Sequence, residues 1–414
     1  MDLNKKTEKN KVYGWDWILI IGLTVAPMNE FRVGKVGPGE ALVLLWCMRY
    51  LGRFAVLHLN DLISRFWILF LPILALGTGY CMIIYPEEAS PGGLATYLSF
   101  AFFSILIVVG MSDRTAEQIK SFIYTAGIVV ACWYLYLLYY SEHISYYFYG
   151  ATLWYHDTRF SGGANNPHQI ATLLGAVLYF NIIHITDTKS SLLSRLMALI
   201  SAFSCVYVSL QTKSSTLVVA IILTFALFLY YLALKNLKSK TQKWIATSVL
   251  IILFAVVVGV FREKLFDYIF EWIESDANGL GRLEIFATIG DTLRKNWIIG
   301  LGPGVHGMNG VIEYHNAYLE ILAMSGVIGL GLFAFFSVRL FMLLMEDTRM
   351  VFCVVPLYVY GLGGFSMRRI SFWIIVAVLV AYALRLRKER KTTDSGMSSA
   401  FSDRPGFPKR KAQS

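Results

Sequence analysis

A histidine and an asparagine stand directly before a long apolar segment of the chain. The sequence reads YHNAYLEILAMSGVIGLGLF, with His315 and Asn316 at its start. Asparagine is a favoured N-cap, so we expect Asn316 to begin a helix here. The partial positive charge of a helix N-terminus favours a neutral imidazole, the form that accepts a proton. His315 is therefore a candidate general base, with a structural histidine bonded to a loop carbonyl as the alternative.

Three cations in other segments could hold phosphate groups. Arg282 opens an amphipathic stretch, and its planar fork suits bidentate phosphate binding. Lys213 lies beside Ser214 in LQTKSSTLVV, a turn too short for a flexible loop. Arg159 precedes GlyGly and AsnPro, which predict a turn that contains Asn166. A surface ion pair would also explain Arg282, and contact with lipid headgroups would explain the other two cations.

The histidines do not suggest a metal site. Those in segments predicted to share one side of a membrane are His143, His156, His168, His306 and His315. Their spacings match no standard pattern for metal ligands, and the chain has no Walker loop, GxSxG or HExxH motif. We therefore expect no metal and no cofactor, and we expect His168 to complete the turn before the next helix.

Membrane helices must position these residues. The 414-residue chain is 56% hydrophobic and 15% charged, and its mean hydropathy is +0.56. A bilayer core is crossed by about 20 mostly apolar residues in a helix. The candidate spans are 15–28, 38–50, 66–85, 94–111, 122–140, 169–186, 195–211, 215–234, 244–261, 316–345, 350–364 and 370–385. The sequence predicts an all-α, polytopic integral membrane protein with about twelve transmembrane helices.

Lysine and arginine placement predicts the orientation. With the N-terminus in the cytoplasm, the inner segments carry most of the basic residues, as insertion favours. We expect residues 1–14 to be a cytoplasmic segment, 15–385 a membrane domain, and 386–414 a basic, disordered cytoplasmic tail. The first apolar segment lacks a cleavage site, so it is expected to be a retained helix. This topology explains the net charge of +10 without a nucleic-acid partner.

Two long outer loops follow from this topology, at about 141–168 and 262–315. The second contains amphipathic stretches that are expected to lie along the membrane surface. Basic residues on the outer side oppose the insertion bias. They are Arg32, Lys35, Arg159, Lys213, Arg262, Lys264, Arg282, Arg294, Lys295, Arg368 and Arg369. Apart from the three candidate phosphate holders, we interpret most of these as contacts with membrane lipids.

Several short motifs in order along the chain resemble the O-antigen ligase and O-antigen polymerase superfamily. They run from about residue 158 to 335. They are TRFSGGANNP (158–167), the TKSS turn (212–215), Gly281-Arg282, GLGPG (300–304), HNAYLE (315–320) and SGVIGL (325–330). The resemblance implies glycan transfer from an undecaprenyl-diphosphate carrier to a sugar acceptor, without a metal, on the periplasmic face of the bacterial inner membrane. It assigns His315 to the loop histidine of the family and Arg282 to its loop arginine.

The chain departs from the family at two positions. Lys213 stands where arginine is usual, which keeps the charge but removes the bidentate fork, and His168 replaces a frequent asparagine. Residues and resemblance agree on a mechanism in which Arg282, Lys213 and Arg159 hold the diphosphate. His315 deprotonates the attacking hydroxyl in this mechanism, and direct displacement inverts the anomeric configuration.

The acceptor remains open at this point. A ligase would use lipid A-core as the acceptor, and a polymerase would use a carrier-linked repeat. The substitutions at Lys213 and His168 favour the polymerase side slightly. A transporter or flippase of lipid-linked or anionic substrates is the alternative from another class, but it requires ionisable residues in mid-membrane, and the predicted span interiors are nearly free of them.

Overall fold

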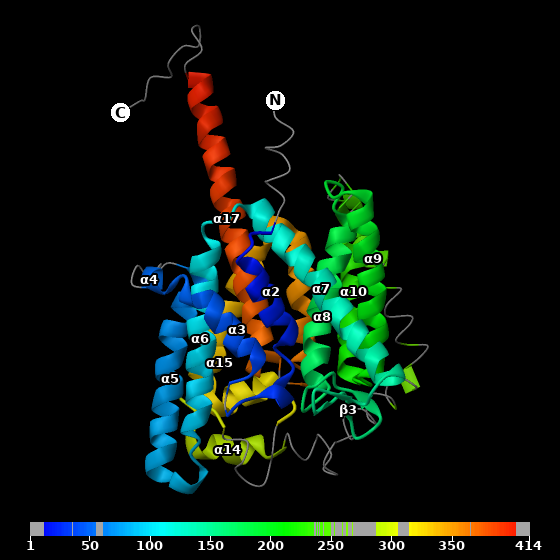
Figure 1. Cartoon of the computed structure of the whole chain (residues 1–414). Coiled ribbons are helices and arrows are strands. Elements are labelled where there is room, and N and C mark those ends of the chain that lie inside the picture. The colour runs from blue at the N-terminus through cyan, green and yellow to red at the C-terminus, as the bar shows by residue number, and fades with distance from the viewer. Residues whose placement is uncertain are drawn as a thin grey trace, which may run out of the picture.

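Helices form most of the structure, which is a computed structural model. It describes residues 12–34, 36–54, 61–235, 287–304, 314–364 and 366–402, and short runs and single residues between 237 and 267. The helices are α2 (Asp16–Val25), α3 (Pro38–Met48), α4 (Leu51–Phe54), α5 (Leu62–Ile84), α6 (Pro91–Met111), α7 (Ala116–His143), α8 (His168–Thr186), α9 (Leu192–Gln211), α10 (Ser215–Lys235), α14 (Ile289–Asn296), α15 (Ala317–Leu344), α16 (Val351–Tyr360) and α17 (Ile370–Ser402) (Figure 1). Short 3-10 segments η1 (Asn29–Phe31), η2 (Pro86–Glu88), η4 (Met345–Met350) and η5 (Ser366–Arg368) join some of them.

Helices lie at all the predicted spans except 244–261, which falls largely outside the described residues. Eight helical stretches of the described part are long and apolar enough to cross a membrane, and α2 and α3 are shorter apolar helices. The prediction of an all-α polytopic membrane protein is therefore confirmed. The number twelve is not tested by the described part of the chain.

Polar side chains fix where several helices begin. Asp61 accepts hydrogen bonds from the backbone N–H groups of Ile63 and Ser64 at the start of α5. Thr115 and Gln118 form a reciprocal capping box at the start of α7. Such caps satisfy N–H groups that have no partner within the helix.

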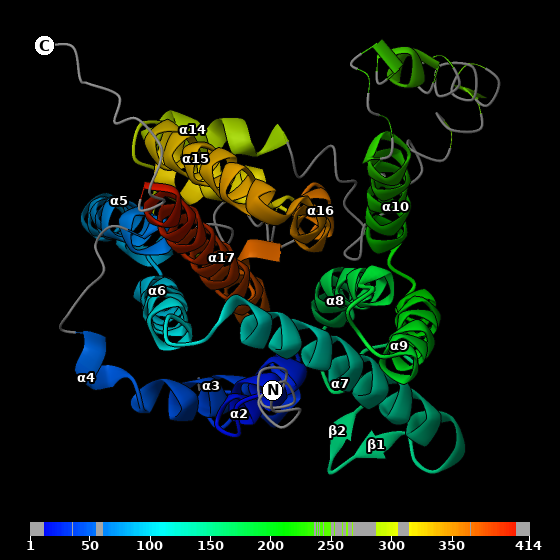
Figure 2. The same cartoon turned by 90° about the horizontal axis from the view of Figure 1, so that it is seen from above.

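Helix α17 lies at the centre of the bundle. Viewed along the helices, it packs between α6 and α7 on one side and α15 on the other (Figure 2). An aromatic cluster fills the contact between α5, α15 and α17. Its members include Trp67, Phe336 and Trp373, and the rings of Trp67 and Trp373 are 4.5 Å apart. The α8 helix packs against α7, α9 and α16 in a second layer.

The predicted outer segments share one end of the bundle. Helix α14 and the hairpin that contains β3 (Trp154–Tyr155) lie at this end, and α17 finishes at the opposite end (Figure 1). We call the end with α14 the outer end. That it faces the periplasm remains a prediction from the positive charges.

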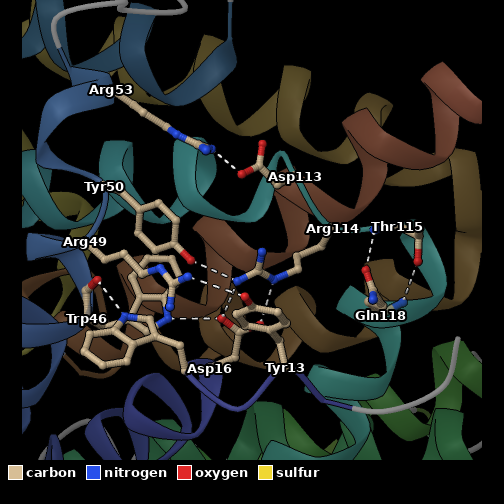
Figure 3. Close-up of polar contacts among 11 residues, drawn as sticks. Tyr13, Asp16, Trp46, Arg49, Tyr50, Arg53, Asp113, Arg114, Thr115 and Gln118 are labelled. Atoms are coloured by element: carbon tan, nitrogen blue, oxygen red, sulfur yellow. Dashed lines mark hydrogen bonds and ion pairs between the residues drawn. The ribbon is translucent and has the colours of Figure 1, made fainter. Parts of the chain in front are cut away.

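A network of polar contacts ties the helices together at the inner end (Figure 3). The carboxylate of Asp16 accepts hydrogen bonds from the guanidinium of Arg114 at 3.0 and 3.1 Å, and from Trp46 Nε1 at 3.1 Å. Arg114 also donates to the hydroxyl of Tyr50 at 2.9 Å. These side chains join the start of α2, the end of α3 and the connection between α6 and α7.

The last helix extends into the segment that the sequence predicts as a cytoplasmic tail from residue 386. Helix α17 continues beyond the predicted end of the span at 385 and reaches Ser402. Glu389 accepts a hydrogen bond from Arg385 at 2.9 Å and another from the backbone N–H of Ala116. Glu346 forms ion pairs with Arg387 and Arg390. These contacts extend the helix, whereas residues 403–414 lie outside the described part.

Helix α15, at the span predicted over 316–345, contains a break. Gly326 has a φ of +61° and interrupts the helix. The segment Trp297–Gly302 forms hydrogen bonds with the backbone on both sides of the break. The N–H groups of Leu301 and Gly302 donate to the carbonyls of Ala323 and Met324, and the N–H of Val327 donates to the carbonyl of Trp297. A side chain at position 326 would come within 2.2 Å of the Ile298 carbonyl oxygen. Each motif is therefore hydrogen-bonded to residues directly before the other: GLGPG to Ala323 and Met324, and SGVIGL to Trp297 and Ile298. These bonds satisfy backbone groups that the break releases.

Two small hairpins occupy the loop predicted at 141–168. Strand β1 (Tyr147–Phe148) pairs with β2 (Ala151–Thr152), and β3 pairs with β4 (Arg159–Phe160), both antiparallel. The backbone N–H of Thr152 donates to Glu30 Oε2 at 2.7 Å. This contact attaches the hairpins to the connection between α2 and α3.

Candidate active site

The turn that carries Lys213 is as tight as the sequence predicts. Helix α9 ends at Gln211 and α10 begins at Ser215, which leaves three residues between them. Lys213 has a φ of +47°, and its backbone N–H donates to the carbonyl of Leu210 at 3.1 Å. Its side chain is exposed at the outer end, so the ammonium group is accessible to a ligand.

Arg159 lies against this turn. It belongs to strand β4, and its Nε donates to the backbone carbonyl of Thr212 at 3.0 Å. Burial lowers the pKa of the Arg159 guanidinium from its ordinary value, although the nearby hydroxyls of Tyr360 and Tyr155 act in the opposite direction. Arginine remains protonated because its ordinary pKa is so high. The structure thus places two of the three predicted phosphate holders side by side.

His168 connects the turn of Lys213 to helix α16. It is the first residue of α8, and its backbone N–H donates to Asn166 Oδ1 at 2.9 Å. Its ring Nδ1 lies 2.6 Å from the hydroxyl of Tyr360 and 3.5 Å from Ser214 Oγ. The backbone of His168 thus belongs to the predicted turn that contains Asn166, whereas its ring lies beside Tyr360 and Ser214.

Tyr360 is a member of this cluster that sequence reasoning missed. It ends α16 at the outer end and is 1% exposed. The available signal was its polar hydroxyl at the outer end of a predicted span, next to the glycines of GLGG. A buried tyrosine hydroxyl needs a hydrogen-bond partner, and here His168 is that partner.

His315 and Asn316 adjoin the same region through the loop after Tyr360. Asn316 is the N-cap of α15: its Oδ1 accepts from the backbone N–H groups of Tyr318 and Leu319 at 3.0 Å each. The predicted cap is therefore confirmed. Asn316 Nδ2 also donates to the carbonyl of Leu362 at 3.0 Å, two residues beyond Tyr360.

The backbone is strained at both His315 and Lys213. His315 is half-buried and has a φ of +50°, in the left-handed region like Lys213. For a residue with a side chain this conformation costs about 1–2 kcal/mol. Strain of this kind concentrates at functional sites, where the surrounding structure holds a side chain in one direction.

Arg282, the third predicted phosphate holder, lies outside the described residues. Its role stays a prediction. The nearest described helix of the same loop is α14, which agrees with the second of the expected amphipathic stretches.

A cavity of about 530 Å³ opens at the outer end beside this cluster. Its wall includes Arg32, Arg368, Arg369, Glu320 and Gln169, together with Pro303 and Gly304 of the GLGPG motif. Gln169 follows His168, and Glu320 lies in the first turns of α15. A small recess bordered by Ala317, Glu320 and Arg368 adjoins the cavity.

Three of the outer arginines that we interpreted as lipid contacts line this cavity. Arg32 forms an ion pair of 2.8 Å with Glu40, and Arg368 lies 3.7 Å from Glu320 Oε1. Arg32, Arg368 and Arg369 gather at one wall because the α2–α3 connection and the start of α17 meet there. Their common signal in the sequence was an outer position that opposes the insertion bias.

The fold and the site define a class: a polytopic helical membrane protein with cations, histidines and hydroxyls gathered at one end of the bundle. A family model described as O-antigen ligase matches residues 196–334, about a third of the chain. The match includes Lys213, Arg282 and His315, and it confirms the resemblance to the O-antigen ligase and polymerase superfamily. It indicates a glycosyltransferase-like membrane enzyme in surface polysaccharide assembly. No curated protein matches the chain.

Proposed function

We propose that the protein transfers a glycan from an undecaprenyl-diphosphate carrier to a sugar hydroxyl at the periplasmic face of the inner membrane. One observation carries this proposal. The family match spans Lys213, Arg282 and His315, and hydrogen bonds link the Lys213 turn through His168 and Tyr360 to the region of His315 and Asn316.

The proposed donor site holds the diphosphate with cations. Arg159 and Lys213 flank one turn at the outer end, and Arg282 would approach from the loop before α14. Negative charge grows on the diphosphate as the glycosyl bond breaks. Positive side chains fixed beforehand stabilise that charge without reorganisation during the reaction.

In the proposed mechanism His315 takes the proton from the acceptor hydroxyl as its oxygen attacks the anomeric carbon. The bond between this carbon and the diphosphate oxygen breaks in the same step, so the configuration inverts. Diphosphate is a good leaving group, so the leaving oxygen needs no general acid. The strained backbone and the Asn316 cap support His315 in this role because they fix the direction of its side chain.

The proposal is tested with His315→Ala and Arg282→Ala in a strain that lacks the native protein, with glycolipids separated on gels. His143→Ala is the matched control, because His143 is exposed at the end of α7 and stacks on Tyr139. Both test variants should lose product at normal protein levels, and the control should not. Carrier-linked long polymer would identify a ligase, and single repeats on lipid would identify a polymerase. Wild-type polymer in both variants would overturn the proposal.

A further inference from the structure

The arginine cavity at the outer end continues into an apolar groove on the lipid-facing side of the bundle. The groove has a volume of about 620 Å³ and lies between α3, α5 and α6. Cavity and groove share Val36, Glu40, Ser99 and Phe103 in their walls. They therefore form one continuous site with a polar outer part and an apolar part deeper along the helices.

The polar part suits an anion. Its wall carries three arginines and two glutamates, a net charge of +1. Arg32 pairs with Glu40, but the Arg32 side chain is 43% exposed, so part of its guanidinium remains accessible. Arg368 forms an ion pair with Glu320 at 3.7 Å, and its side chain is 33% exposed. A planar guanidinium group that is accessible in this way can donate two parallel hydrogen bonds to two oxygens of one phosphate.

The apolar part suits a hydrocarbon chain. Leu44, Leu71, Leu98, Phe102 and Ile105 line it, and Leu44 and Leu98 are 41% and 49% exposed toward the surroundings of the bundle. From Leu98 to Ile105 the groove follows α6 for roughly 10 Å at 1.5 Å per residue.

We propose that cavity and groove together bind a single-chain polyprenyl diphosphate, the lipid anchor of the acceptor. The arginines hold the diphosphate and the groove holds the first part of the chain. The recess beside Ala317 adjoins the cavity, so a sugar on this diphosphate lies next to the first turn of α15, which follows His315 and Asn316 in the chain. The binding site rests on the geometry alone, whereas its role as the acceptor site rests on the proposed function.

The outer end of the bundle then carries two groups of cations. Arg159 and Lys213 lie on the side of α8, α9 and α10, and Arg32, Arg368 and Arg369 lie on the side of α3, α6 and α17. A reaction between two lipid-linked glycans needs two such sites. The inference therefore favours a polymerase, with a carrier-linked repeat as the acceptor, over a ligase that uses lipid A-core.

Native mass spectrometry of the full-length protein in detergent tests the site, with undecaprenyl diphosphate as the probe. Leu98→Trp fills the groove; Leu76→Trp is its control, because Leu76 is 62% exposed on α5 and is not part of the groove. Arg368→Gln/Arg369→Gln removes two cations; Arg294→Gln on α14 is the control for an exposed outer arginine.

We expect two bound lipids in the wild type. Leu98→Trp and the double variant should bind the second lipid roughly tenfold more weakly, and the controls should not.

The probes separate the sources of binding. Inorganic pyrophosphate, the headgroup without a tail, should compete weakly, and phosphatidylglycerol should not displace the probe. Equal binding by Leu98→Trp and Leu76→Trp would overturn the proposal, as would full displacement by phosphatidylglycerol, which would indicate an ordinary bilayer lipid.

Lys213→Ala distinguishes this inference from the proposed function. It should weaken binding of the other lipid and leave the lipid affected by Leu98→Trp in place. One bound lipid that is sensitive to Lys213→Ala but not to Leu98→Trp would leave the donor site standing and overturn the acceptor site. One bound lipid with the reverse sensitivity would place the carrier in the cavity and contradict the donor role of Lys213.

Discussion

The Nε of Arg159 donates to the backbone carbonyl of Thr212 at 3.0 Å, which joins the outer hairpin to the turn of Lys213. The two positions are 53 residues apart in the sequence. One nitrogen of the guanidinium fixes the turn, and the same group adds a positive charge beside the ammonium of Lys213. Arg159 therefore has both a structural and an electrostatic part in the proposed donor site.

Arg159→Ala should lower the rate of glycan transfer roughly ten- to a hundredfold, because a charge-assisted hydrogen bond contributes about 1.5–3 kcal/mol. Arg159→Lys keeps the charge but not the geometry of the fork, so it should recover only part of the rate. Polymer formation in membranes with added lipid-linked repeat measures both. Arg294→Ala is the control on the same end of the protein. A full rate in Arg159→Ala would contradict the donor role.

Asn316→Ala should lower the free energy of unfolding by about 1 kcal/mol, because the N–H groups of Tyr318 and Leu319 lose their cap. Asn316→Asp keeps the cap but cannot donate to the carbonyl of Leu362. If this second bond positions His315, the aspartate variant should unfold like the wild type and still transfer glycan more slowly. Thermal unfolding in detergent and a transfer assay separate the two effects, and an aspartate variant with the full rate would remove the positioning role.

Much of the fold could be predicted from the sequence because membrane spans depend on local composition. Runs of about 20 apolar residues located the long helices, and Asn316 marked the start of α15 through its side-chain chemistry alone. The tight turn at Lys213 was also local, since the apolar segments on both sides leave only three residues. The contact between Arg159 and this turn was not predictable, because it joins segments that are distant in the sequence.

The features that were missed depend on packing between distant segments. Gly326 breaks α15 because the segment Trp297–Gly302 supplies the backbone partners, and hydropathy over 316–345 contains no trace of this. Arg368 and Arg369 could be recognised as unusual from their side of the membrane, but their cavity forms only when α6, α15 and α17 meet. The helical continuation beyond residue 385 is likewise supported by a contact of Glu389 with a neighbouring helix.

The buried pair of Asp16 and Arg114 should be important for stability rather than for catalysis, because it lies at the inner end of the bundle (Figure 3). Asp16→Ala leaves the guanidinium buried without its carboxylate, and breaking a buried pair costs about 3–5 kcal/mol. Thermal unfolding in detergent should show this loss. The double variant Asp16→Ala/Arg114→Met should be less harmful than Asp16→Ala alone.

The exposed pair of Arg53 and Asp113 is a control for this network. Asp113→Ala should change the free energy of unfolding by less than about 1 kcal/mol, since exposed ion pairs contribute little. Equal losses in Asp16→Ala and Asp113→Ala would show that burial does not strengthen the inner pair.

Asp187 should make stability depend on pH at the inner end, where it follows α8. Burial alone would raise the pKa of this carboxyl, but the backbone N–H of Lys189, the ammonium of Lys120 at 3.1 Å and the hydroxyl of Tyr124 outweigh it and hold the pKa below its ordinary value. The carboxylate therefore stabilises the fold fully above the pKa of the unfolded chain, about 3.9. This stabilisation is lost as the pH falls from there through the lower pKa of the folded state.

Thermal unfolding between about pH 3 and 7 should show a steeper loss of stability with falling pH in the wild type than in Asp187→Asn, which is already less stable at neutral pH. Asp113→Asn should keep the steep loss of the wild type, and a wild-type profile in Asp187→Asn would contradict the assignment.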